Sequence, residues 1–205
     1  MDSRGGYKDV ARTVKKGKKL AGKRQVQALE LAQPAKRKPP RRPKLSQRKL
    51  DKACAAHRKW LETRDGKPPA NLENKDAQGL DLSEADLRDA QLQKVILSGA
   101  NLQEANLSGA NLQEAHLSFA NLQEANLSFA NLQEANLFGA NLREAYLFEV
   151  KAATASQIKR ATNWRLAFYS DDFLAELGLP TDHNETILKK FKEIDKEKEK
   201  TATSP

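Results

Sequence analysis

The sequence contains few of the residues that build a large mixed core or a covalent site. Its 205 residues include one cysteine, Cys54, one methionine and two tryptophans. A single cysteine excludes an intrachain disulfide and a metal site made of several cysteines. No apolar run approaches the roughly 18 residues that a membrane span requires. The lysine-rich start of the chain lacks the apolar core of a signal peptide, so we expect a cytoplasmic protein without a membrane span.

Residues with catalytic potential are also scarce and scattered. The three histidines, His57, His116 and His183, lie in three different regions of the sequence. No nucleophile–base spacing, pair of catalytic carboxylates, glycine-rich phosphate loop or metal motif is present in the sequence. We therefore expect a protein that is not an enzyme and that uses no cofactor. Structural roles are the better interpretation of Cys54 and His57.

Charge divides the chain into three segments that the overall value of +9 conceals. Residues 1–69 hold 22 Lys and Arg against 6 Asp and Glu, residues 70–150 hold 4 against 12, and residues 151–205 hold 10 against 9. The sequence therefore predicts a basic N-terminal arm joined to an acidic body.

The body is repetitive, with a period of five residues. Residues 80–149 divide into 14 pentads without an insertion, and the central residue of every pentad is leucine. The residue two places before the leucine is small or apolar, and it is alanine in every pentad from Ala100 onward. Residues 70–79 continue the frame less faithfully. An internal repeat of this kind decides the architecture before any single motif does.

A period of five fits neither an α-helix nor a free strand, whose side chains repeat every 3.6 and 2.0 residues. The period is explained if each pentad forms one side of a square coil, with the leucine and the small residue pointing inward. Four pentads then make one turn of 20 residues. The pentads with the pattern A-N-L-x-x, such as residues 100–104 and 105–109, resemble the A-(D/N)-L-x-x signature of the pentapeptide-repeat family. The resemblance implies an all-β solenoid, a right-handed quadrilateral parallel β-helix.

The same resemblance sets the expected domain limits. Residues 70–150 form about four coils, which span roughly 19 Å at the spacing of neighbouring strands. Residues 46–69 contain a capping helix that begins at Ser46 and presents Leu50, Cys54 and His57 to the first coil. The sequence from His57 to Thr63 resembles a leader of bacterial members of the family.

The segment after the repeats is expected to close the other end. Residues 151–180 form a C-terminal cap with a helix at 156–163 and a second helix between Ser170 and Gly178. Its A-x-N-W motif resembles one found in bacterial members of the family. Residues 181–205 form an amphipathic helix that fades into a charged tail. Four aromatic or apolar residues are expected over the last coil: Trp164, Phe168, Phe173 and Leu177.

The outward positions divide among the four sides of the square. Glu84, Glu104, Glu124 and Glu144 stack on one side, and Glu114 and Glu134 stack on the opposite side. Aromatic residues occupy the other two sides, with Phe119 and Phe138 on one and Phe129, Tyr146 and Phe148 on the other. Such outward aromatics indicate a contact surface. Its occupant is the C-terminal helix of the same chain, a second copy forming a homodimer, or another protein. The repeated asparagines before the leucines are expected to serve turns and ladders.

Residues 1–45 are expected to form a disordered basic arm, because they hold many cations, four prolines and few large apolar residues. Such an arm binds nucleic acid or another polyanion without reading bases, or it binds the acidic faces of its own chain or of another protein. The residues assigned to polyanion binding are Lys15, Lys16, Lys18, Lys19, Lys36, Arg37, Lys38, Arg41 and Arg42.

The function that these features favour is a protein-interaction scaffold with a polycationic tether. The alternative is a DNA mimic that binds gyrase, as some members of the resembled family do. Net charge over the expected length gives one charge per about 2.4 Å, against about 1.7 Å for duplex DNA. The basic arm and the asparagines at most ladder positions favour the scaffold.

Overall fold

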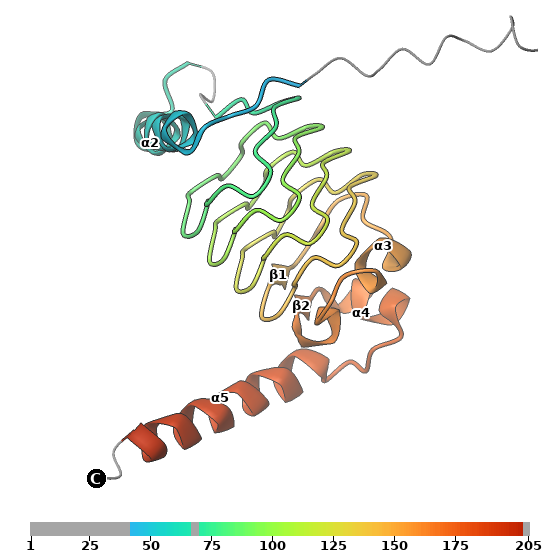
Figure 1. The fold of residues 1–205 in the computed structure, drawn as a ribbon. Helices are drawn as coiled ribbons and strands as arrows, with labels where there is room; N and C mark the ends of the chain where they lie inside the picture. Colours follow the sequence, from blue (N-terminus) through green and yellow to red (C-terminus); the bar gives the residue numbers. More distant parts are fainter. Residues whose placement is uncertain (1–41, 67–69, 203–205) are drawn as a thin grey trace, which may run out of the picture. The chain divides into compact units, whose positions relative to one another are not determined.

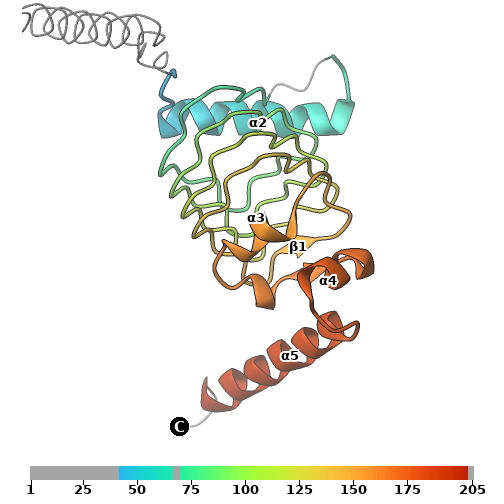
Figure 2. The same cartoon turned by 90° about the vertical axis from the view of Figure 1, so that its right-hand side faces the viewer.

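The computed structural model describes residues 42–66 and 70–202 (Figure 1). The predicted basic residues from Lys15 to Arg41 lie outside this range. The described part divides into a stack of square coils, a helix across its N-terminal end, and a group of short helices with one long helix at its C-terminal end (Figures 1 and 2).

Parallel backbone pairing repeats every 20 residues through the body. Asn101, for example, pairs with Asn121, which pairs with Asn141. This offset confirms that four pentads make one turn. We number the four sides in chain order by their central residues. Side 1 contains Leu72, Leu92, Leu112 and Leu132; side 2 contains Ala77, Leu97, Leu117 and Leu137; side 3 contains Leu82, Leu102, Leu122 and Leu142; side 4 contains Leu87, Leu107, Leu127 and Leu147.

Each side ends in a tight turn, which we call the corner of the same number. The carbonyl of the central leucine accepts a hydrogen bond from the amide three residues later, as between Leu102 and Ala105 at 3.1 Å. The second residue after the leucine has a positive φ, 65° at Gly99 and 58° at Glu104. This combination is that of a type II turn. The corners therefore point two side chains per pentad into solvent.

The interior of the stack holds leucine and alanine. Leu102, Leu122 and Leu142 are completely buried, and so are Ala100, Ala120 and Ala140. Full burial of a leucine side chain stabilises a fold by about 1.5–3 kcal/mol. Two inward side chains share each side, which explains why the second is nearly always alanine.

The asparagines before the leucines hold the corners and join the coils. Asn101 Oδ1 accepts a hydrogen bond from the backbone amide of Gln103, two residues further on, at 3.3 Å. On side 3 the side chains also bond to one another from coil to coil. This continuous row runs through Asp81, Asn101, Asn121, Asn141 and Asn163, with donor–acceptor distances from 2.8 to 3.2 Å. The asparagines thus have the structural role that the sequence predicts.

Helix α2 (Gln47–Thr63) lies across the first coil (Figures 1 and 2). Its N-cap is Ser46, although the Ser46 side chain makes no capping hydrogen bond. Leu50 and His57 are its buried residues. The Gln47 amide group pairs with both backbone groups of Asp81, donating to the carbonyl at 2.6 Å and accepting from the amide at 2.9 Å. One side chain thereby occupies the position of a missing strand on side 3.

His57 satisfies two further backbone groups of the first coil. Its Nε2 donates to the carbonyl of Arg88 at 2.8 Å, and its Nδ1 accepts from the amide of Ala70 at 3.4 Å. On side 2 the backbone itself supplies the partner, because Leu45 donates to the Asp76 carbonyl and Asp76 donates to the Pro43 carbonyl. Residues 42–45 therefore belong to the body, which corrects the predicted arm boundary at residue 45.

The C-terminal end departs from the repeat. Helix α3 (Ala155–Lys159) begins with a capping box between Thr154 and Gln157. The Gln157 amide also donates to the carbonyls of Leu132 and Ala135 at 3.1 and 3.0 Å, while Ile158 fills the interior. The predicted helix at 156–163 is thus shorter and earlier, because the chain at Arg160 turns to pair with Gly139.

Side 3 and side 4 are extended by irregular backbone. A 3₁₀ helix, η1 (Trp164–Leu166), precedes β2 (Phe168–Tyr169), which pairs in parallel with β1 (Tyr146–Leu147). Helix α4 (Asp171–Leu177) ends at Gly178, whose φ is 68°. Phe173 and Leu177 join the main core, and Trp164 packs against it.

Phe168 is a correction to the predicted cover of the last coil. Tyr169 enters the main core instead, and its hydroxyl donates to the Trp164 carbonyl at 2.7 Å. Phe168 faces outward and forms a second cluster with Ile187 and Phe191 of helix α5 (His183–Ala202). The reason is the alternation of a strand, in which neighbouring side chains point to opposite faces.

Asn184 closes the last strand in the same way as Gln47 closes the first coil. Its side chain accepts from the Tyr169 amide at 3.2 Å and donates to the Tyr169 carbonyl at 2.7 Å. The neighbouring His183 is buried and its Nε2 donates to the Ala167 carbonyl at 3.1 Å. A carboxamide and a buried histidine therefore complete the backbone pairing at both ends of the stack.

Candidate interaction surfaces

Corner 2 carries an exposed aromatic pair. Phe119 and Phe138 are 66% and 48% exposed, and their rings meet edge to face at 5.4 Å. Phe119 has a φ of 59° at a position where the other coils of this corner have glycine. A side chain with this φ is disfavoured by roughly 1–2 kcal/mol. Neither burial nor local conformation therefore favours phenylalanine here.

The neighbours of this pair make room for it and extend it. A Cβ atom at Gly139 would lie 2.7 Å from the Phe119 ring, so the ring covers a position that only glycine fits. On the other side, the Arg160 guanidinium lies 5.7 Å from the centre of the Phe138 ring. Side 2 has no outward carboxylate after Asp76 in the described coils. The result is an uncharged aromatic ridge that ends in an arginine.

The aromatics of side 4 have a different fate. Tyr146 stacks on Phe168 with ring centres 5.1 Å apart, and Phe148 packs against the cluster formed by Phe168, Ile187 and Phe191. Helix α5 therefore covers these two, which selects the intrachain alternative for them. Phe129 stays 52% exposed.

Corner 3 carries the predicted row of glutamates. Gln103 and Gln123 donate to Glu104 and Glu124 at 3.0 Å, each from the preceding residue. Arg143 forms an ion pair with Glu144 at 2.8 Å. The row is thus engaged by its own corner residues, which lowers its capacity to recruit a cationic partner.

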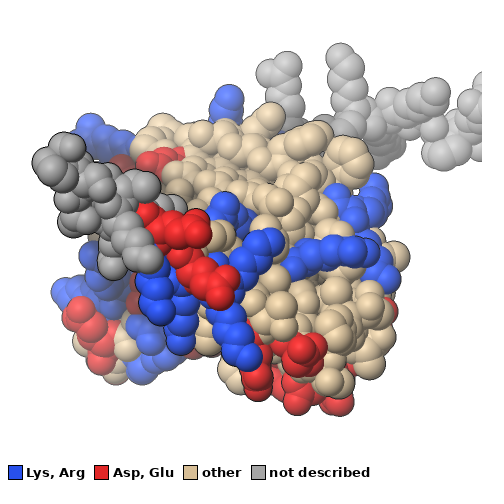
Figure 3. Space-filling view, turned by 90° about the horizontal axis from the view of Figure 1, so that it is seen from below, with Lys and Arg blue, Asp and Glu red and all other residues tan. Residues whose placement is uncertain are grey.

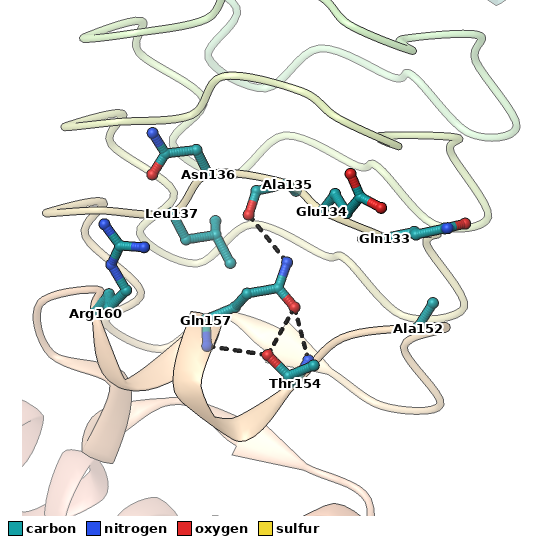
Figure 4. Close-up of a pocket in the computed structure, with 9 residues that line it drawn as sticks. All are labelled: Gln133, Glu134, Ala135, Asn136, Leu137, Ala152, Thr154, Gln157 and Arg160. Atoms are coloured by element: carbon teal, nitrogen blue, oxygen red, sulfur yellow. Dashed lines mark hydrogen bonds between the residues drawn. The ribbon is translucent and has the colours of Figure 1, made fainter.

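Corner 1 carries Glu114 and Glu134. Lys94, one coil before Glu114, lies 3.4 Å from it. Glu134 has no ion-pair partner among the residues that the structure describes. It lines a pocket of about 510 Å³ at the end of this corner (Figure 4). Gln157 lies at the centre of the pocket, with its amide toward Ala135, and Arg160 lies at its margin (Figure 4).

The pocket offers no catalytic constellation. Its polar groups are already bonded, because Gln157 is held by Thr154 and by backbone carbonyls. Within residues 42–66 and 70–202, no group of three or more His, Cys, Asp or Glu side chains is placed to hold a metal ion. In the same residues, no helix is long and apolar enough to cross a membrane.

Of the residues assigned to polyanion binding, only Arg42 lies in the described range. Its Nη1 donates to the carbonyl of Lys94, so it is fixed to the second coil. Cys54 is half-buried, and burial together with nearby Asp51 raises the pKa of its thiol. Such a thiol reacts slowly, which agrees with a structural role.

The C-terminal end has mixed charge. Seen from the end that carries α5, lysine and arginine side chains cross the surface, with acidic groups between them (Figure 3). The acidic character of the body therefore does not continue over this end.

Comparison with known proteins identifies the repeats. The family model described as pentapeptide repeats matches eight copies over residues 70–103 and 100–139. The repeat region belongs to the pentapeptide-repeat family. Pentapeptide-repeat proteins fold as right-handed quadrilateral β-helices, and the 20-residue pairing and inward leucines of this chain are those of that fold.

Several solved pentapeptide-repeat structures are similar to this chain. One from the thylakoid lumen of Arabidopsis thaliana is 29% identical, with 44% of this chain and 69% of that chain covered and a TM-score of 0.37. Rfr23 from the cyanobacterium Cyanothece 51142 is 37% identical, with 53% and 65% covered and a TM-score of 0.38. A pentapeptide-repeat protein from Nostoc is 26% identical, with 68% and 97% covered and a TM-score of 0.27. Among curated proteins, no sequence matches this chain.

Proposed function

We propose that this protein is a non-enzymatic interaction scaffold that binds a protein partner through the aromatic ridge of corner 2. The scaffold is a stack of about four coils closed at both ends by helices, and the basic arm is its tether. The observation that carries the proposal is the pair Phe119 and Phe138, which remains exposed after α5 has covered Phe148. Exposed aromatics held on a rigid backbone are typical anchors of protein interfaces.

The DNA-mimic alternative is less well supported. Four carboxylates of the body form ion pairs with its own cations, namely Asp86, Asp89, Glu114 and Glu144. The row on side 3 that faces solvent consists mainly of asparagine. A mimic of duplex DNA requires a continuous run of unpaired charge.

Substitution of the ridge tests the scaffold. We expect Phe119→Ala with Phe138→Ala to abolish recovery of a saturable protein partner in an affinity pull-down. Truncation of a central aromatic anchor costs about 2 kcal/mol or more, so the two changes weaken binding by at least roughly 100-fold. Glu104→Gln with Glu124→Gln is the matched control at another corner and leaves recovery unchanged. Equal recovery with the ridge variant would show that corner 2 is not the interface.

The tether is tested separately with a labelled DNA duplex. Residues 1–41 hold 13 Lys and Arg against 3 Asp and Glu. We expect the full chain to bind the duplex and residues 42–205 to bind it far more weakly. A segment that neutralises about five phosphates loses binding by a factor on the order of several hundred between about 50 and 200 mM salt. Affinity that survives removal of the arm, or that ignores salt, would contradict a polycationic tether.

A further inference from the structure

The point at which the basic arm joins the body is fixed. Pro43 and Leu45 pair with Asp76 on side 2, and the Arg42 side chain reaches the Lys94 carbonyl at corner 1. The arm therefore meets the body beside the second coil of corner 1. Corner 3, with its longer row of glutamates, is at the opposite corner of the square.

Corner 1 presents carboxylates directly beyond this point. Glu114 is one coil further from Lys94, and Glu134 is two coils further. Coils are spaced about 4.8 Å apart, so Glu134 lies roughly 10 Å along the stack from Lys94. We call Glu114 and Glu134 the corner 1 pair. The only cation paired with either of them among the described residues is Lys94.

The sequence just before Arg42 has the matching length and charge. Arg41, Lys38, Arg37 and Lys36 precede it, and Pro39 and Pro40 separate Arg41 from the other three. Proline fixes its own φ and favours an extended backbone in the residue before it, with a rise of about 3.1 Å per residue in a polyproline helix. Four residues from Arg42 to Lys38 thus span about 12 Å, enough to bring the three consecutive cations to Glu134.

We propose that residues 36–41 dock on the corner 1 pair of their own chain. The partner is chosen by proximity and charge, since these cations are tied within a few residues of Glu114 and Glu134. Docking goes beyond the scaffold function and does not depend on it. Its consequence is that the body competes with an external polyanion for the basic cluster, so a bound polyanion displaces residues 36–41 from corner 1.

A spin label on the arm of the full chain tests this contact. The variant Cys54→Ser with Ala35→Cys places one label beside the basic cluster, and backbone amide signals are recorded without nucleic acid. We expect strong broadening at residues 113–115 and 133–135 at low salt. Because the Debye length falls to about 3 Å at 1 M salt, the broadening disappears there.

Two matched double variants locate the contact. Glu114→Gln with Glu134→Gln removes two charges at corner 1 and is expected to abolish the broadening. Glu104→Gln with Glu124→Gln removes the same charge at the opposite corner and is expected to preserve it. Broadening that is absent at low salt, that centres on corner 3, or that survives the corner 1 variant would overturn the proposal. None of these outcomes depends on the pull-down or on DNA binding, so the two proposals fail independently.

Discussion

Leu122→Ala is expected to lower the free energy of unfolding by about 2–5 kcal/mol, the range for a buried leucine whose site cannot collapse. Leu122 is completely buried at the centre of side 3, between Leu102 and Leu142. The backbone on both sides of it is held by coil-to-coil hydrogen bonds, including Leu122 to Asn141 at 3.0 Å. The neighbouring coils therefore cannot move inward to fill the space.

Equilibrium unfolding in urea measures this effect, with circular dichroism as the signal. Gln123→Ala is the matched control, because Gln123 is the next residue and points outward at corner 3. The control is expected to change the free energy of unfolding by less than about 0.5 kcal/mol, as substitutions at surface positions usually do. Similar losses for both variants would show that Leu122 does not fill the interior.

His57→Ala is expected to cost about 2–4 kcal/mol, from a lost buried ring and two unsatisfied backbone groups. The Arg88 carbonyl loses its donor and the Ala70 amide loses its acceptor. The ring also stacks on Trp60, with ring centres 5.3 Å apart. Removal of His57 therefore loosens α2 from the first coil as well as exposing the backbone.

Hydrogen exchange of the first-coil amides locates this loss. We expect faster exchange at Ala70 and in the first coil, and unchanged exchange at the third coil. His116→Ala is the control, since His116 is exposed on side 2. If the two histidine variants had equal stability and equal exchange, the proposed role of His57 in closing the first coil would be wrong.

The regular part of this fold is predictable from the sequence because every pentad solves the same packing problem. Leu122 and Ala120 are placed by a period that repeats without an insertion, and the pairing of Asn101 with Asn121 follows from that period. The period also assigns Phe119 and Phe138 to one corner. Their mutual contact at 5.4 Å needs no information beyond the 20-residue turn.

The ends are not predictable in the same way, because their contacts occur once. Gln47 pairs with Asp81 across 34 residues, and Asn184 pairs with Tyr169 across 15, without a spacing that recurs. Gln157 occupies a position where the repeat has leucine, yet it supplies hydrogen bonds rather than apolar surface. The choice between Phe168 and Tyr169 depends on where β2 begins after η1, which the sequence pattern does not mark.

The 20-residue turn also limits how this molecule can change in length. An insertion of five residues would advance every later side chain by a quarter of a revolution, so the C-terminal helices would arrive above different faces. An insertion of 20 residues would lift those helices by one storey, about 4.8 Å, and leave each residue above the face it occupies now. Duplication in whole revolutions is therefore the route by which the body grows without rebuilding either lid.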